Sequence, residues 1–189
     1  MKRRLPIIIL LVIMLFALIS CTPKMKKGEA EELAANIIFN DLTVEYTGDE
    51  FEITFEGTLV DASTYHYFYN GKNQETPFKF KNVGNYSVKL IIENPNYNIY
   101  EKKIVFSIKQ ATPKITAPVA SAIEYGQFLS DSELTGGVAD VEGTFAWANP
   151  EIKPEIEKAR EEGYEALFTP DDKLNYKTVS IKIKFEVEP

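Results

Sequence analysis

The sequence predicts an all-β protein built from two tandem modules, and two observations support this prediction. In the last segment, 181–188, apolar and charged residues alternate strictly, as in a strand with one buried and one wet face. The same alternation occurs earlier in the chain, where Ile104, Phe106 and Ile108 precede Ile183, Phe185 and Val187 at a constant spacing. The chain of 189 residues is long enough for one domain or two small ones, so a duplicated module fits its length.

Further landmarks keep this spacing, to within one position, from one end of the module to the other. A spacing this constant indicates a tandem duplication, because chance alignment of β-rich sequence would not place the same rings and glycines at the same points. The matching pairs are Tyr46 with Tyr125, Gly57 with Gly136, Tyr67 with Phe145, Tyr69 with Trp147, and Asn96-Tyr97 with Asn175-Tyr176.

The repeat fixes the expected domain limits. The first β module covers residues 37–110, the linker is 111–113, and the second β module covers 114–189. The second module contains one segment that departs from the β pattern: Glu155–Glu162 has only helix-forming residues and is followed by Gly163. With Pro154 at the first helical position and glycine after the last, we expect a helix of two to three turns that connects two strands.

The first twenty residues have the pattern of a signal peptide. A basic start is followed by the uninterrupted apolar run Ile7–Ile19, which as a helix is about 20 Å long and too short to span a bilayer of about 30 Å. Leu18-Ile19-Ser20-Cys21 resembles the bacterial lipobox. This resemblance implies cleavage before Cys21 and a diacylglycerol on its sulfur, the alternative being an uncleaved N-terminal anchor. Residues 21–36 then form a lipidated start and a tether, with a short helix in its later part.

The second module resembles the repeats of bacterial surface proteins called MBG domains, of the YGX type. The first module is similar but looser, through Tyr46–Gly48, Val83–Val88 and Asn96-Tyr97. The resemblance implies Ig-like β-sandwich modules displayed on a cell surface, without catalytic residues. A β-grasp fold is the competing architecture for the second module, because its charged, helix-prone segment is unusual for the family. The motifs that carry the resemblance there are Ala111–Pro113, Ile123–Gln127, Gly143–Trp147, Phe168–Pro170 and Asn175-Tyr176.

Charge and composition exclude several kinds of function. The net charge is −7, and without residues 1–20 it is −10, which does not suit nucleic-acid binding because that depends on Lys and Arg. One Cys and one His exclude an intrachain disulfide and a histidine cluster for zinc. We therefore expect no catalytic residues, no cofactor and no metal, and the chain is predicted not to be an enzyme.

Individual residues that could carry chemistry have ordinary structural explanations. His66 lies among tyrosines and has no orienting acid or nucleophile placed around it, so we interpret it as a strand-surface residue. Asp131 and Glu133 could meet Asp140 and Glu142 at one end of the second module and hold calcium, although no EF-hand spacing is present. Exposed tyrosines could stack on sugars, but at period two they are expected in the core.

These observations predict a lipoprotein held at the extracytoplasmic face of a bacterial cell membrane through Cys21. Its modules would be structural or adhesive, with a surface protein or a glycan as the partner. The alternatives are a protein that binds a glycan or peptide in an aromatic-lined pocket, and, less favoured, a hydrolase with coupled carboxylates.

Overall fold

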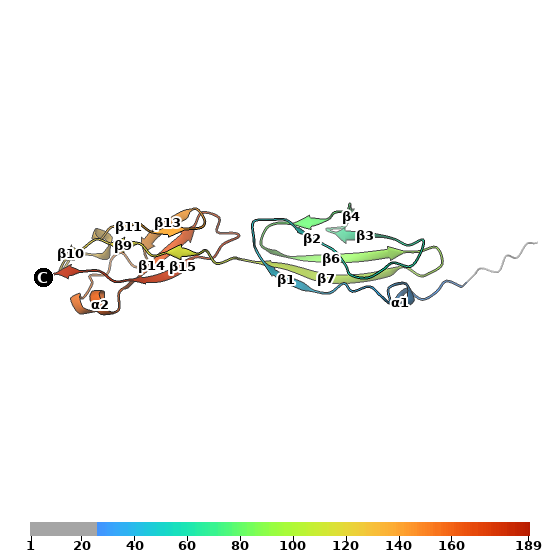
Figure 1. Cartoon of the computed structure of the whole chain (residues 1–189), viewed down its shortest axis with the longest axis horizontal. Helices are drawn as coiled ribbons and strands as arrows, with labels where there is room; N and C mark the ends of the chain where they lie inside the picture. The colour runs from blue at the N-terminus through green and yellow to red at the C-terminus, as the bar shows by residue number, and fades with distance from the viewer. Residues whose placement is uncertain (1–25) are drawn as a thin grey trace, which may run out of the picture.

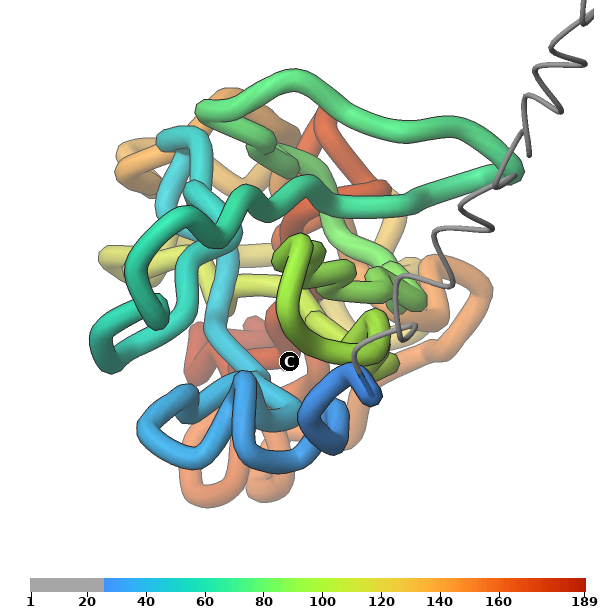
Figure 2. The backbone as a smooth tube through the Cα atoms, turned by 90° about the vertical axis from the view of Figure 1, so that its right-hand side faces the viewer, coloured from blue at the N-terminus to red at the C-terminus, as the bar shows by residue number. Residues whose placement is uncertain are grey.

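The computed structural model describes residues 26–189, so the predicted signal peptide and Cys21 lie outside the described residues. Figure 1 shows two groups of strands end to end, with the first described residues at one end of the molecule and the C-terminus at the other. Seen along the long axis in Figure 2, the second group lies behind the first. Each group has its own cluster of buried apolar side chains. The described part of the chain is therefore an elongated all-β protein with two cores.

The first module is a two-layer sandwich with the strand order of an immunoglobulin-like domain. Its main sheet has the order β1-β7-β6-β3-β4, in which β1 runs parallel to β7 and the other neighbours are antiparallel. The antiparallel pair β2–β5 forms the second layer. This is the G-F-C-C′ sheet of an Ig domain facing its B–E pair. The strands are β1 (Leu42–Glu45), β2 (Phe51–Glu52), β3 (Thr64–Tyr69), β4 (Lys72–Gln74), β5 (Lys79–Phe80), β6 (Gly84–Glu93) and β7 (Tyr100–Lys109).

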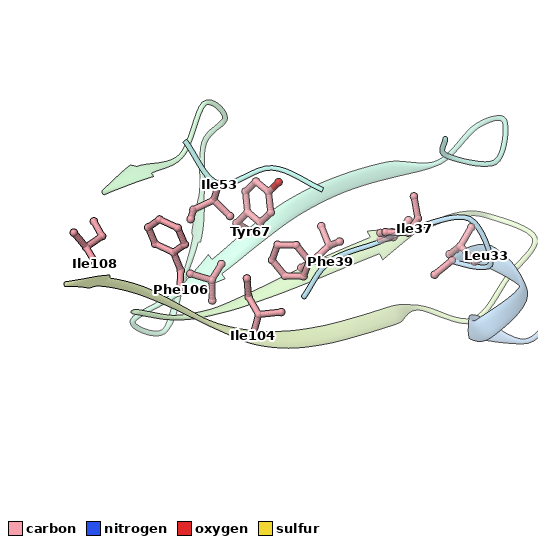
Figure 3. Close-up of a cluster of buried hydrophobic side chains, with 12 residues drawn as sticks. Leu33, Ile37, Phe39, Ile53, Tyr67, Ile104, Phe106 and Ile108 are labelled. Carbon is pink, nitrogen blue, oxygen red and sulfur yellow. The ribbon is translucent and has the colours of Figure 1, made fainter. Parts of the chain in front are cut away.

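Side chains from alternate positions of the central strands fill the space between the layers. On β7 these are Ile104, Phe106 and Ile108, which confirms the period-two prediction for this strand. Tyr67 of β3 points into the same core, between the layers (Figure 3). Burial of this kind, at about 25 cal/mol per Å² of apolar surface, supplies most of the favourable folding free energy.

Residues 28–36, expected to belong to the tether, fold onto the first module instead. Helix α1 (Ala30–Leu33) covers one end of the sandwich, and Leu33 is only 1% exposed. Ile37 and Phe39 continue this buried row into the core (Figure 3). The apolar residues within the acidic segment explain the difference, because burial against the sheet end removes them from water.

The second module repeats the central strands of the main sheet, but its described residues contain no counterpart of β4. Strands β13, β14 and β15 form an antiparallel sheet, and β10 pairs parallel with β16 beside it. The short pairs β9–β11 and β8–β12 supply the remaining strands. The elements are β8 (Ile115–Thr116), β9 (Val119–Ala120), β10 (Ile123–Glu124), the 3-10 helix η1 (Leu129–Asp131), β11 (Leu134–Thr135), β12 (Val138–Ala139), β13 (Gly143–Trp147), α2 (Ile156–Glu161), β14 (Tyr164–Pro170), β15 (Val179–Ile183) and β16 (Val187–Glu188).

The sequence repeat is also a repeat of strand register. Val44 of β1 pairs with Ile108, and their counterparts in the repeat, Ile123 of β10 and Val187, pair with each other in the same way. Likewise Tyr67 pairs with Leu90 in the first module, and its counterpart Phe145 pairs with Phe168. The two modules are thus built on one arrangement of strands, which favours the Ig-like architecture over the β-grasp alternative for the second module.

The predicted helix is present as α2, although it is shorter than expected. It spans six residues and begins after Glu155, so Pro154 precedes the helix instead of opening it. Gly163 has φ +75°, the left-handed conformation that suits the residue after a helix. The last predicted strand is interrupted between Ile183 and Val187, where the Phe185 N–H donates to the Ala159 carbonyl instead of to a strand. The helix therefore breaks the strand against which it packs.

Candidate functional site

Most residues considered for chemistry have structural roles. Asp131 accepts a hydrogen bond from the Phe128 N–H at 2.9 Å, and Asp140 accepts one from the Lys114 N–H at 3.0 Å, so both carboxylates stabilise turns. His66 lies half-exposed on β3. Within residues 26–189 no group of three or more His, Cys, Asp or Glu side chains is placed to hold a metal ion. No helix in this part of the chain is long and apolar enough to cross a membrane.

The aromatic residues considered for sugar stacking lie mostly in the cores. Tyr67 is 2% exposed, and the partly buried rings of Tyr69, Tyr97 and Tyr100 pack against the same core. In the second module Trp147, the counterpart of Tyr69, is 8% exposed, and its Nε1–H donates to the Ser132 carbonyl at 2.9 Å. Tyr65 is more exposed, but its ring stands edge-on to Phe55 at 4.9 Å between centroids. These contacts confirm that rings at period two serve packing first.

A hollow in the second module also differs from an aromatic-lined ligand site. It has a volume of about 400 Å³ and opens widely to solvent. The Arg160 guanidinium on its wall already pairs with the Glu186 carboxylate at 3.0 Å. Its lining contains one aromatic residue, Phe185, and three small or branched apolar residues, Val119, Ala120 and Ala122. With a single aromatic ring and two of its three charged side chains already paired, the hollow is not the aromatic-lined pocket that a glycan or peptide site would need.

The site with the most specific geometry is the junction of the two modules. The chain leaves β7 and immediately pairs with the loop between β14 and β15. The Ala111 N–H donates to the Asn175 carbonyl at 3.0 Å, and the Lys177 N–H donates to the Ala111 carbonyl at 2.9 Å. The incoming backbone is therefore held as a short parallel bridge against the Asn175-Tyr176 loop.

The first module holds its own incoming chain by an equivalent pair of backbone hydrogen bonds. The Gly28 N–H donates to the Asn96 carbonyl at 2.8 Å, and the Asn98 N–H donates to the Gly28 carbonyl at 2.9 Å. Asn96 and Asn98 are the counterparts of Asn175 and Lys177 in the sequence repeat, so Gly28 has the place that Ala111 has in the second module. The recurring Asn-Tyr pair thus marks the loop where the chain enters each module.

The side chain of Asn175 adds a contact that Asn96 does not make. Asn175 is 4% exposed, and its Oδ1 accepts a hydrogen bond from the Val83 N–H of the first module at 2.9 Å. Its Nδ2 donates to the Asp172 carboxylate at 2.8 Å, which fixes the orientation of the amide. A buried amide with both ends bonded is held in one position, because an unmet hydrogen bond there would cost about 1–3 kcal/mol.

Two further contacts between the modules lie beside Asn175. The Gln110 Nε2 donates to the Lys173 carbonyl at 2.9 Å and lies close to two other carbonyls of the same loop. The rings of Tyr46 and Tyr176 meet edge-to-face with centroids 5.3 Å apart. Desolvation, followed by the neighbouring Tyr46 and the carboxylates of Asp140 and Asp172, raises the pKa of Tyr176 above its ordinary value. Backbone, amide and ring contacts together join the two modules.

Sequence reasoning found the loop but not the residues that join the modules. The repeated Asn-Tyr pair pointed to an equivalent place in both modules. The partner of Asn175 is the backbone N–H of Val83. A backbone group can belong to any residue, so the side-chain pattern of the sequence does not predict this partner. Gln110 lay just inside the expected limit of the first module and carried no motif.

No family model matches the chain, and no curated protein matches it. Among solved structures, a titin I-band fragment aligns with 80% of this chain at 7% identity and a TM-score of 0.39. The four N-terminal Ig domains of a Dscam1 isoform align with 77% of it at 11% identity and a TM-score of 0.35. The insect immune protein hemolin aligns with 78% at 13% identity and a TM-score of 0.36. The chain spans 64%, 43% and 45% of these three structures. The assignment of the Ig-like fold rests on strand order and register.

Proposed function

We propose that this protein is a bacterial surface lipoprotein whose two Ig-like modules, of the MBG type, form a stiff structural or adhesive spacer outside the membrane. The observation that carries this proposal is the junction, in which the buried Asn175 amide bonds across to Val83. A chain that only linked two independent modules would need no such contact. The elongated arrangement in Figure 1 then sets the distance between the two ends of the molecule.

The lipobox-like segment supports attachment through Cys21. Two acyl chains, at about 0.8 kcal/mol for each buried CH₂ group, would anchor the protein stably to the cell membrane on its extracytoplasmic side. Gly28 is already bonded to the first module, so only the segment 22–27 separates Cys21 from that module. Fully extended, this segment reaches at most about 25 Å. The proposed spacer would therefore stand close to the membrane rather than on a long tether.

The anchor is tested by substituting Cys21→Ala in the producing bacterium. The variant should lose incorporation of labelled palmitate and appear in the soluble fraction, because the thioether can form only on the cysteine sulfur. A Ser20→Ala variant is the matched control, since it keeps a small residue before the cysteine and should be acylated normally. Unchanged labelling and membrane retention of the Cys21→Ala variant would contradict a lipid anchor.

A further inference from the structure

Strand β13 has one edge that pairs with no other strand of the described residues. In the first module the equivalent strand β3 lies between β6 and β4, whereas β13 pairs with β14 alone. The connection after β13 passes into α2 instead of returning as a further strand. Figure 1 shows β13 along one border of the second module. This border is the place where a neighbouring strand is present in the first module and is missing in the described part of the second.

The backbone groups on that edge follow from the register. The Ala148 N–H donates to the Glu165 carbonyl at 2.9 Å, so position 148 faces β14. Because N–H and C=O groups alternate sides along an antiparallel strand, Thr144 and Ala146 also face β14, and Phe145 faces the open edge. Within the described residues the Phe145 N–H has no hydrogen-bond partner. An extended strand is the structure that can satisfy such a row of groups.

The edge also lacks the features that normally block strand addition. Exposed edges usually carry Lys, another charged residue or a proline. The segment 143–149 has none of these, in a chain of which 26% of the residues are charged. Thr144 and Ala146 are exposed and small, so another strand can approach without a steric clash. The uncharged edge offers nothing to recognise a charged peptide, but it suits an equally uncharged strand.

We propose that β13 is a self-association edge, which pairs antiparallel with β13 of a second copy of this chain. A two-fold axis at Phe145 would place the two open edges against each other, with Thr144 of one copy opposite Ala146 of the other. A closed two-fold contact of this kind uses the same surface on both copies. The net charge of each copy, −7 for the full chain and −10 without residues 1–20, is screened beyond about 8 Å at physiological salt, and the strands in contact carry no charge.

The antiparallel arrangement determines whether the two copies are anchored in the same membrane or in two different ones. A two-fold axis across β13 reverses the direction of the second copy. The N-terminal side of the first module and the far end of the second module lie at opposite ends of the molecule (Figure 1). The anchors of a pair would thus point in opposite directions and lie in two facing membranes. This part of the inference rests on the proposed lipid anchor, whereas the pairing itself does not.

Charge substitutions at Thr144 and Ala146 test the pairing. The Thr144→Lys/Ala146→Lys variant puts lysines opposite each other, and the Thr144→Glu/Ala146→Glu variant does the same with glutamates; like charges directly opposite destabilise a strand pair. Each variant alone should sediment as a monomer, and an equal mixture should recover the dimer. Thr144→Lys/Ala146→Glu, which is self-complementary, should stay dimeric and serves as the control that substitution leaves the strand folded.

The measurement is sedimentation velocity of the full chain in detergent, followed by clustering of vesicles that carry it. We expect the wild-type protein to have about twice the monomer mass and to cluster vesicles. A monomeric wild-type protein, or a dimer unchanged by both like-charge variants, would overturn the pairing and leave the anchor untouched. A protein that is dimeric in detergent but does not bind vesicles would instead contradict the lipid anchor, while the pairing through β13 would stand. A dimer that places both anchors in one vesicle without clustering would overturn pairing between facing membranes.

Discussion

The side-chain oxygen of Asn175 accepts a hydrogen bond from the backbone N–H of Val83, over 2.9 Å and across the boundary between the two modules. Asn96 has the equivalent place in the first module, where its side chain forms no hydrogen bond within the described residues and is exposed. The duplication therefore supplied two copies of one loop, and only the second copy joins modules.

Substitution of Trp147 should unfold the second module and spare the first. Trp147→Ala removes a buried ring, at a cost of about 3–5 kcal/mol, and leaves the Ser132 carbonyl without its donor. A module of about 75 residues has a small free energy of unfolding, so a loss of this size is enough to unfold it. Thermal melting followed by circular dichroism should show loss of about half the β signal at 37 °C. Trp147→Phe keeps a ring, so its melting temperature should lie between those of Trp147→Ala and wild type. A Trp147→Ala variant that melts like wild type would show that the ring adds nothing to the core.

Alkaline pH should destabilise the first module through Tyr67. Desolvation, followed by the neighbouring Tyr65 and Glu52, raises the pKa of the Tyr67 phenol well above its ordinary value near 10. Below pH 10 the phenol is neutral in both states, so its contribution is constant. Above pH 10 the unfolded chain ionises first, so the free energy of unfolding falls as pH rises. Urea unfolding from pH 9 to pH 11 should give a shallower decline for Tyr67→Phe than for wild type. Equal slopes would contradict the role of Tyr67, and Tyr125→Phe, at an exposed tyrosine of the second module, is the control.

Gly28 should tolerate no side chain. A Cβ atom there would lie 2.5 Å from the Tyr97 ring, so Gly28→Val must displace either the ring or the incoming chain. We expect the segment around α1 to detach, with faster amide hydrogen exchange at residues 28–36 and a loss of about 1–2 kcal/mol of stability. Lys27→Val, one residue earlier and exposed, should exchange like wild type. Unchanged exchange in Gly28→Val would mean that the bridge to Asn96 does not hold this segment.

The sequence predicted the strands, the duplication and the helix because each leaves a periodic or compositional pattern. Ile104, Phe106 and Ile108 are inward-facing because period two places them so, and Ile156–Glu161 is helical because it lies in a segment that contains only helix formers. Burial of Leu33 was missed because a single apolar residue in an acidic segment has no periodicity. The bond from Asn175 to Val83 joins residues far apart in the chain, and it depends on how two finished modules meet.

Distances between spin labels in the two modules test the central claim, that the junction holds the modules in one orientation. Labels at Lys103→Cys and Lys182→Cys lie on exposed strand positions of each module, and a Cys21→Ser substitution removes the one native cysteine of the chain. The full chain should give one narrow distance distribution. Adding Asn175→Ala should broaden it, because the Val83 N–H loses its acceptor. Adding Asn96→Ala, the matched control, should leave it narrow. A broad distribution in the unsubstituted junction, or a narrow one after Asn175→Ala, would contradict a junction fixed by Asn175.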